Sequence, residues 1–143
     1  MRKYSYSLMV MLLALLSVGF SACSNDDEPK GADIVGTWQH NHHTEYNDVY
    51  YYFTKDGKFH YVWKTRIVTS HHGFMPTVVV YHGTYTVSGT KLIVTMDSNP
   101  TDDLYLCPTE CEFSVQGDTL KVVLGEEEHT FTRVNDNAIQ PYM

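Results

Sequence analysis

Histidine is the residue type in this sequence with the clearest capacity for chemistry, since eight occur among 143 residues. His40 and His42 lie two positions apart, so on a strand their rings would project to the same side. Paired imidazoles suit Zn²⁺, Cu²⁺ or a haem iron. The further imidazoles that could join them are His60, His82 and the neighbours His71 and His72. No fixed helical spacing accompanies them, so polar surface histidine is the preferred interpretation, and we expect no cofactor.

Aromatic side chains are the second candidate group, with eleven Tyr and two Trp in the chain. Aromatic rings with polar tips could line the mouth of a pocket for an apolar, amphiphilic or glycan ligand. The alternative is ordinary cross-strand packing, which stabilises any antiparallel sheet. The candidate ligand-binding residues are Tyr50, Tyr52, Tyr61, Trp63, Tyr81 and Tyr85, with Tyr46 nearby.

Two cysteines, Cys107 and Cys111, lie four positions apart and flank Pro108. In a straight strand such positions are about 13 Å apart, whereas a disulfide needs Cα atoms roughly 4.4–6.8 Å apart. A bond therefore requires a turn, which Pro108 permits. A loop disulfide and two free thiols both remain open, and the spacing is not that of a redox-active Cys-x-x-Cys motif.

Catalytic motifs are missing from the sequence: it has no Gly-x-Ser-x-Gly, phosphate-binding loop or helical zinc motif. The residues 126–128 are Glu-Glu-Glu, which indicates a solvated turn. The chain has 17 acidic and 10 basic residues, a net charge of −7. This balance argues against nucleic-acid partners, which require a basic face. We therefore expect a protein that is not an enzyme.

The N-terminus has the pattern of an export signal. Arg2 and Lys3 precede an apolar run, Leu8–Phe20, that is too short to span a membrane as a helix. Small residues then lead directly to Cys23, which resembles the lipobox of bacterial lipoproteins. We expect a signal peptide at 1–22 and acylation of Cys23, anchoring the chain to a membrane. Ordinary secretion with a free Cys23 is the alternative.

A polar, acidic segment follows Cys23 and has no apolar periodicity, so we expect residues 23–33 to form a disordered tether. Without the signal, 8 basic and 17 acidic residues remain, a net charge of −9. An acidic run behind a lipidated Cys resembles a surface-export signal of Gram-negative lipoproteins. We expect an outer-membrane lipoprotein exposed at the surface, the alternative being one that faces the periplasm.

The rest of the chain predicts an all-β domain over 34–134 and a frayed C-terminal tail over 135–143. Strand-like segments recur about every ten residues, separated by turn signals such as Asp56-Gly57. The expected strands are 34–43, 48–54, 59–67, 77–87, 91–96, 110–115, 119–124 and 129–134. No amphipathic helix longer than one turn is expected.

Eight successive strands with short turns favour an antiparallel up-and-down barrel, because closure removes exposed sheet edges. A sandwich of two sheets is the alternative. An eight-stranded barrel has room for packed side chains or for one small ligand. If the apolar alternating residues fill it completely, ligand storage becomes less plausible and partner binding more so. Those residues are Leu92, Val94, Phe113, Leu120 and Val122.

Several segments together resemble the lipocalin-like domains of bacterial lipoproteins, over about 34–134. Gly36-Thr37-Trp38 is similar to the Gly-x-Trp signature of lipocalin and calycin barrels. The segments 53–59, 83–92 and 131–134 resemble the hairpins and last strand of the family. The resemblance implies that Trp38 closes one end of the barrel and that Arg133 crosses its ring, with Gly36 part of the closure. Such cation–π stacking contributes roughly 0.5–2 kcal/mol.

Two functions follow from this resemblance and the residues above. The first is a lipid-anchored module that binds a small apolar or amphiphilic ligand or a glycan fragment. The second is a structural or accessory lipoprotein that acts through envelope protein partners, with a filled barrel. Fold alone does not assign either one.

Overall fold

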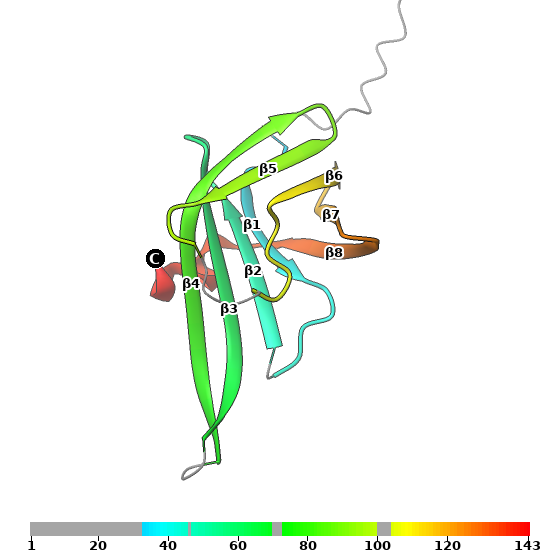
Figure 1. The fold of residues 1–143 in the computed structure, drawn as a ribbon. Helices are drawn as coiled ribbons and strands as arrows, with labels where there is room; N and C mark the ends of the chain where they lie inside the picture. The colour runs from blue at the N-terminus through cyan, green and yellow to red at the C-terminus, as the bar shows by residue number, and fades with distance from the viewer. Residues whose placement is uncertain (1–32, 46, 70–72, 100–103) are drawn as a thin grey trace, which may run out of the picture.

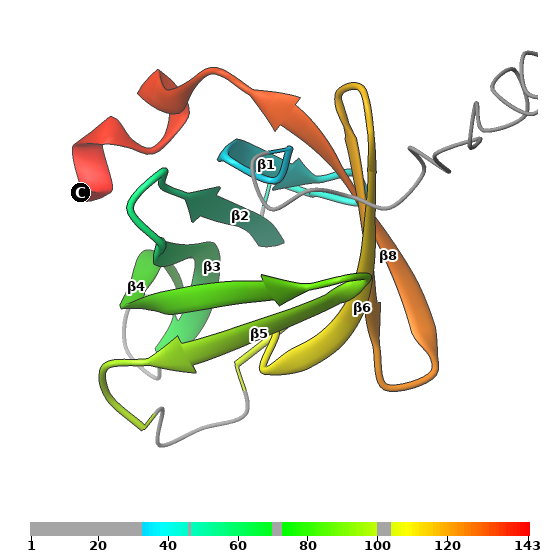
Figure 2. The ribbon, with the colours of Figure 1, turned by 90° about the horizontal axis from the view of Figure 1, so that it is seen from above.

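The computed structural model describes residues 33–45, 47–69, 73–99 and 104–143, which form one closed antiparallel β-barrel (Figures 1 and 2). Each strand pairs with the next along the chain, and the last strand closes the sheet by pairing with the first. The predicted up-and-down barrel is therefore confirmed, and the two-sheet sandwich is excluded. The strands are β1 Gly36–His40, β2 Asn47–Phe53, β3 Lys58–Thr69, β4 Gly73–Ser88, β5 Lys91–Met96, β6 Glu110–Gln116, β7 Thr119–Leu124 and β8 Glu127–Val134.

The β3–β4 hairpin is longer than predicted and projects beyond the other strands (Figure 1). Pro76 was expected to precede β4, yet β4 runs through it, with Pro76 opposite Arg66. A strand tolerates Pro where it has a free edge. Here β4 pairs with β5 only from Gly83 onward, so the outer part of β4 has β3 as its sole paired neighbour among the described residues.

Alternation of side chains separates the barrel interior from its outer surface. The buried interior residues are Ile34, Trp38, Val49, Tyr51, Phe53, Phe59, Tyr61, Leu92, Val94, Cys111, Phe113, Leu120, Val122 and Phe131. All five apolar residues that were expected to fill the barrel are among them. Aromatic rings contact one another across this core; for example, Tyr51 and Phe131 stack with ring centroids 4.3 Å apart.

The C-terminal tail packs against the outside of the barrel, so the expected frayed end was wrong. It forms two short 3₁₀ turns, η1 Asp136–Ala138 and η2 Gln140–Tyr142. Ile139 between them is fully buried in a second apolar cluster with Tyr50 and Val62. Sequence periodicity missed this packing because one buried side chain in a nine-residue segment produces no repeating pattern.

The segments predicted to be a signal peptide and most of the tether, residues 1–32, lie outside the described residues. Cys23, Tyr46, His71 and His72 lie outside them as well. Within the described part of the chain, no helix has the length and apolar character needed to cross a membrane.

Candidate functional site

One end of the barrel, the Trp38 end, is closed by an indole under a guanidinium. Trp38 is fully buried, and its Nε1 donates to the Ile34 carbonyl at 2.7 Å. The Arg133 Cζ lies 4.1 Å from the centre of the Trp38 ring, as the resemblance implied. β1 and β8 place the two residues opposite each other in register. This stacking anchors the first strand of the barrel to the last one.

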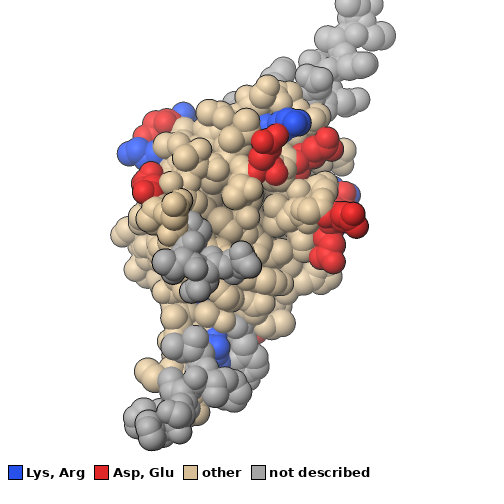
Figure 3. Space-filling view, in the orientation of Figure 1, with Lys and Arg blue, Asp and Glu red and all other residues tan. Residues whose placement is uncertain are grey.

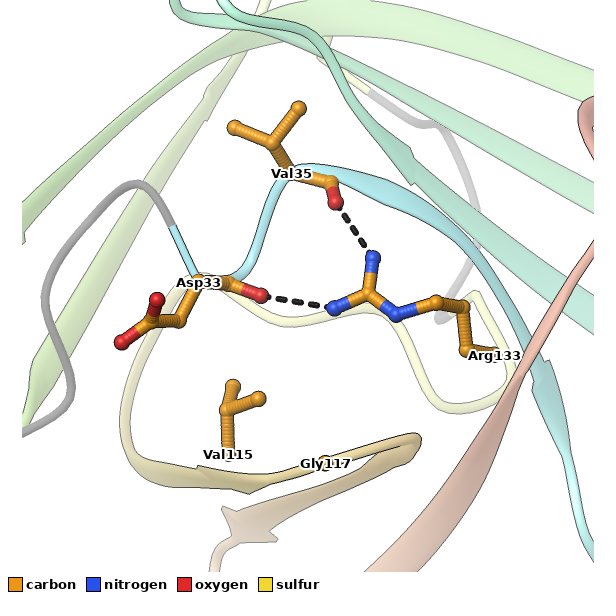
Figure 4. A pocket seen from close by; sticks show the side chains of 5 residues that line it. All are labelled: Asp33, Val35, Val115, Gly117 and Arg133. Atoms are coloured by element: carbon orange, nitrogen blue, oxygen red, sulfur yellow. Dashed lines mark hydrogen bonds between the residues drawn. The ribbon is translucent and has the colours of Figure 1, made fainter.

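The Arg133 guanidinium also ties down the segment before β1. Its Nη1 donates to the Val35 carbonyl at 2.6 Å and its Nη2 to the Asp33 carbonyl at 2.9 Å (Figure 4). Gly36 is required beneath it, because a Cβ there would lie 2.5 Å from Nη1. Gly36 also has a φ of +128°, which side chains disfavour.

A shallow open depression of about 450 Å³ lies at the Trp38 end, lined by Asp33, Val35, Val115, Gly117 and Arg133 (Figure 4). The Arg133 side chain crosses it, but that side chain is already bonded to backbone carbonyls and lies 3.4 Å from the Asp118 carboxylate. The guanidinium is therefore committed to structural contacts and offers little to a ligand.

The aromatic residues proposed to form one ligand-binding set are divided between two faces of the sheet. Tyr50 and Tyr52 point outward, where they contact the second apolar cluster under the C-terminal tail. Tyr50 donates to the Asp48 carboxylate at 2.7 Å, and burial raises its pKa. The expectation that these two residues line the pocket was wrong, because the register turns Val49, Tyr51 and Phe53 inward instead.

The other four members of that set, Tyr61, Trp63, Tyr81 and Tyr85, do belong to the inner face. Tyr85 lies near the Trp38 end, where its hydroxyl donates to the Thr54 carbonyl at 2.8 Å. Trp63 lies towards the opposite end, which we call the mouth: its Nε1 donates to the Asn47 side chain at 2.5 Å. The inner aromatic residues therefore extend along the barrel from one end to the other.

A segment that we call the covering segment, residues 104–109, closes over the mouth. Tyr61 donates its hydroxyl to the Tyr105 carbonyl at 2.5 Å, and Tyr51 donates to the Leu106 carbonyl. The Tyr105 ring lies 5.9 Å from the Trp63 ring. The two fully buried tyrosines thus have polar tips that the barrel wall does not satisfy, and the covering segment supplies their acceptors.

The covering segment also carries backbone strain. Leu106 has a φ of +55°, in the left-handed region that branched side chains seldom adopt. Such strained residues occur at ligand-binding segments when surrounding contacts hold them in place. Here the bond from Tyr51 to the Leu106 carbonyl is one such contact, and the bond from Val94 to the Thr109 carbonyl at 2.7 Å is another.

The two cysteines near the mouth are free, so the loop disulfide that was considered is not formed. Cys111 faces the barrel interior from β6, whereas Cys107 belongs to the covering segment. Burial raises the pKa of each thiol to about 11. Both are therefore protonated near neutral pH, and protonated thiols are poor nucleophiles.

In addition to the Tyr51 and Tyr61 hydroxyls, the interior near the mouth contains the imidazole of His40. It is 4 % exposed, and its Nε2 has no hydrogen-bond partner among the described residues. Its ring contacts Phe131, His129 and His42, with centroids 5.0–5.7 Å away. Burial lowers its pKa, and the neighbouring imidazoles lower it further.

The proposed metal pair, His40 and His42, does not acquire a third ligand in the described structure. No group of three or more His, Cys, Asp or Glu residues is placed there to hold a metal ion. His60 and His82 do not join this pair; they lie opposite each other on β3 and β4. His71 and His72 fall outside the described residues.

The sequence interpretation missed Tyr51, Tyr105 and Leu106. Tyr51 had a usable signal, because it alternates with Val49 and Phe53, a set more apolar than Asp48, Tyr50 and Tyr52. No sequence signal indicated the role of the covering segment, because its carbonyls accept hydrogen bonds from tyrosines that lie 44 and 55 positions away.

Comparisons with known proteins give one structural likeness. Neither a protein-family model nor a curated protein matches the chain. A solved structure described as a lipocalin-like protein from Bacteroides uniformis matches with 18% sequence identity and a TM-score of 0.44. The match covers 71% of this chain and 99% of that one.

The architecture itself defines the class. A single closed meander of eight antiparallel strands is the architecture that lipocalins have. This chain therefore has a lipocalin-like fold, and a barrel of eight strands has room for packed side chains or for one small ligand.

Proposed function

We propose that this domain binds a small, largely apolar ligand with a polar end, at the mouth of the barrel beneath the covering segment. The observation that carries the proposal is that Tyr51, Tyr61 and His40 place polar atoms inside an aromatic interior at that one end. Pockets for small molecules combine apolar walls with a few placed polar groups. The inner face of the barrel supplies both.

Entry of a ligand requires the covering segment to move. The tyrosine hydroxyls now donate to the Tyr105 and Leu106 carbonyls, and a ligand oxygen can accept the same hydrogen bonds. Exchange of one acceptor for another leaves no buried donor unpaired, which avoids a cost of about 1–3 kcal/mol. The strain at Leu106 would be released at the same time.

We further propose that the domain is tethered to the outer membrane by acyl chains on Cys23, at the cell surface rather than towards the periplasm. The support is the export pattern before Cys23 and the acidic segment after it. The proposed binding role requires no catalytic group. Burial raises the pKa of the two thiols near the mouth, so they are poor nucleophiles, and the inner face otherwise presents aromatic rings and hydroxyl groups.

Mass spectrometry of the full chain, purified in mild detergent, tests binding and acylation together. Under native conditions we expect a non-covalent adduct of one small molecule, which disappears under denaturing conditions. We expect the acyl mass to persist under denaturing conditions and to be lost in Cys23→Ser. A bare native mass, unchanged after incubation with dodecanoic acid or dodecyl maltoside, would contradict the binding role.

The accessory role remains the second candidate, and two observations favour it. The five apolar residues that were expected to fill the barrel are all buried in its interior. The projecting β3–β4 hairpin exposes Met75 and Val78, at 46% and 41%. A photo-crosslinker at Val78 would capture a specific envelope protein if this surface binds a partner. The matched control is Ile93, which is 39% exposed on the barrel wall. Equal capture at both positions would count against a docking role for the hairpin.

A further inference from the structure

A pair of histidines on the outer wall of the barrel lies apart from the mouth. His60 on β3 is directly opposite His82 on β4 in the strand register. Their Nδ1 atoms are 2.6 Å apart, and their ring centroids are separated by 4.8 Å at an angle of 78°. Both rings lie on the outer face of the sheet, where His82 is exposed and His60 is half-buried, so a small ion can approach the pair without entering the barrel.

The surroundings hold the His60 ring and the His82 backbone in place. Tyr52, opposite His60 on β2, stacks against the His60 ring with centroids 5.6 Å apart. The His82 carbonyl accepts the Asp97 backbone N–H at 2.9 Å, which fixes this part of β4 to the end of β5. The two imidazoles are thus presented by a paired, internally bonded part of the barrel wall.

The local charges are mixed but include two carboxylates. Burial lowers the pKa of His60, and His82 and Lys58 lower it further. Asp56 and Asp97 act in the opposite direction, so their negative charge is felt at the His60 ring. The same two carboxylates favour any cation held between the rings, whereas Lys58 opposes it.

The geometry points to a metal-binding site: we propose that His60 and His82 chelate one late transition-metal ion through their Nδ1 atoms. Metal–nitrogen bonds of about 2.0–2.1 Å require the two nitrogens to lie roughly 2.9–3.4 Å apart, depending on the angle at the metal. Small rotations of the two side chains widen the present separation to that range. The proton between the two nitrogens moves through solvent to Nε2 of its own ring, so both imidazoles stay neutral, and water fills the remaining positions of the metal.

The chemistry of the pair sets the preferred ion. Imidazole nitrogen suits Cu²⁺, Ni²⁺ and Zn²⁺, and among divalent first-row ions Cu²⁺ binds most tightly to a given set of such ligands. Hard ions such as Mg²⁺ and Ca²⁺ prefer oxygen ligands and have no reason to bind here. The site is independent of the ligand proposed for the mouth, because the rings point outward.

Calorimetric titration of the full chain in detergent tests the proposal, with Cu²⁺ as the probe and Ni²⁺, Zn²⁺ and Mg²⁺ for comparison. We expect binding of one Cu²⁺ that weakens at least tenfold in His60→Gln and in His82→Gln. The matched control is His43→Gln, an exposed histidine whose Nδ1 lies 3.0 Å from the His40 carbonyl and that lies outside the pair. We expect this control to bind Cu²⁺ as the unaltered chain does.

Electron paramagnetic resonance of the Cu²⁺ complex provides a second readout that does not depend on affinity. We expect the signature of two imidazole nitrogens in the unaltered chain and the loss of that signature in His60→Gln. Unchanged unfolding temperatures without metal would show that the variants still fold. Unaltered Cu²⁺ affinity in both pair variants, or equal weakening in His43→Gln, would overturn the proposal.

Discussion

The two ends of this barrel are closed by different means. At the Trp38 end, a buried indole, a glycine and a guanidinium are joined by short bonds to the backbone just before β1. At the mouth, tyrosine hydroxyls meet the carbonyls of a separate segment, and one imidazole nitrogen has no partner among the described residues. The first end is saturated with internal contacts, whereas the second retains polar groups that a ligand can use.

This difference is the basis of our proposal that one end stabilises the barrel and the other binds a ligand. The stacking of Arg133 on Trp38 joins the first and last strands, so it helps to hold the barrel shut. The bonds at the mouth join the barrel to a segment that lies outside the strands and has a strained residue, Leu106. Figure 3, in the orientation of Figure 1, shows that the charged side chains drawn there gather mainly towards the upper part of the molecule and along one side.

The largest effect is expected from Trp38→Ala. Loss of a fully buried Trp costs about 3–5 kcal/mol in the free energy of unfolding, and Arg133 loses its stacking partner. Urea denaturation followed by circular dichroism measures this. A loss below about 1 kcal/mol would show that the Trp38 end does not stabilise the barrel.

The next effect is expected from Gly36→Ala, which introduces a Cβ 2.5 Å from the Arg133 Nη1. We expect a loss of about 2–3 kcal/mol from strain and displacement of the guanidinium. The control is Gly117→Ala, which has a φ of +57° but nothing within 4 Å of the new Cβ. That control should cost only about 1–2 kcal/mol, and equal losses would mean that contact with Arg133 is unimportant.

A comparison of tyrosine hydroxyls separates the two ends more sharply. Tyr51→Phe and Tyr61→Phe each remove one bond to the covering segment, while Tyr85→Phe removes a bond to Thr54 at the Trp38 end. Each change should cost about 1 kcal/mol. Hydrogen exchange should accelerate in residues 104–109 only in the first two variants. Equal acceleration in Tyr85→Phe would contradict a separately mobile covering segment.

The smallest effect concerns pH. Because the pKa of His40 is lowered from 6.5 by burial first, then by His129, His42 and His43, with Asp48 opposing, the folded chain resists its protonation. The unfolded chain then binds more protons below about pH 6.5, so unfolding free energy should fall from about pH 7 to pH 5. His40→Phe should reduce that decline, because it removes the imidazole whose protonation the folded chain resists. An identical pH dependence in the variant would show that His40 is easily protonated when folded.

Local patterns predicted much of this structure from the sequence. Alternation and turn residues located all eight strands, since side-chain direction follows a period of two. The resemblance placed Trp38 and Arg133 at one end, where the structure has them stacked. Errors arose where long-range packing decides: β4 continues through Pro76 because its edge is free, and the tail packs through Ile139 alone.

The mouth was predicted less completely than the Trp38 end. Tyr50 and Tyr52 were placed in the pocket because they are aromatic, but strand register turns Tyr51 inward instead. The acceptors for the tyrosine hydroxyls are backbone carbonyls, whose position no residue type reveals. Side-chain chemistry alone therefore could not identify the covering segment.

The chain contains two tryptophans, one at each end of the barrel, and they allow the most direct test of binding at the mouth. Incorporation of 5-fluorotryptophan gives one ¹⁹F resonance for Trp38 and one for Trp63, assigned with Trp63→Phe. During titration with dodecanoic acid, we expect a saturable shift of the Trp63 resonance and no change at Trp38. A shift confined to Trp38, or no shift at Trp63 while native mass spectrometry shows the acid bound, would contradict it.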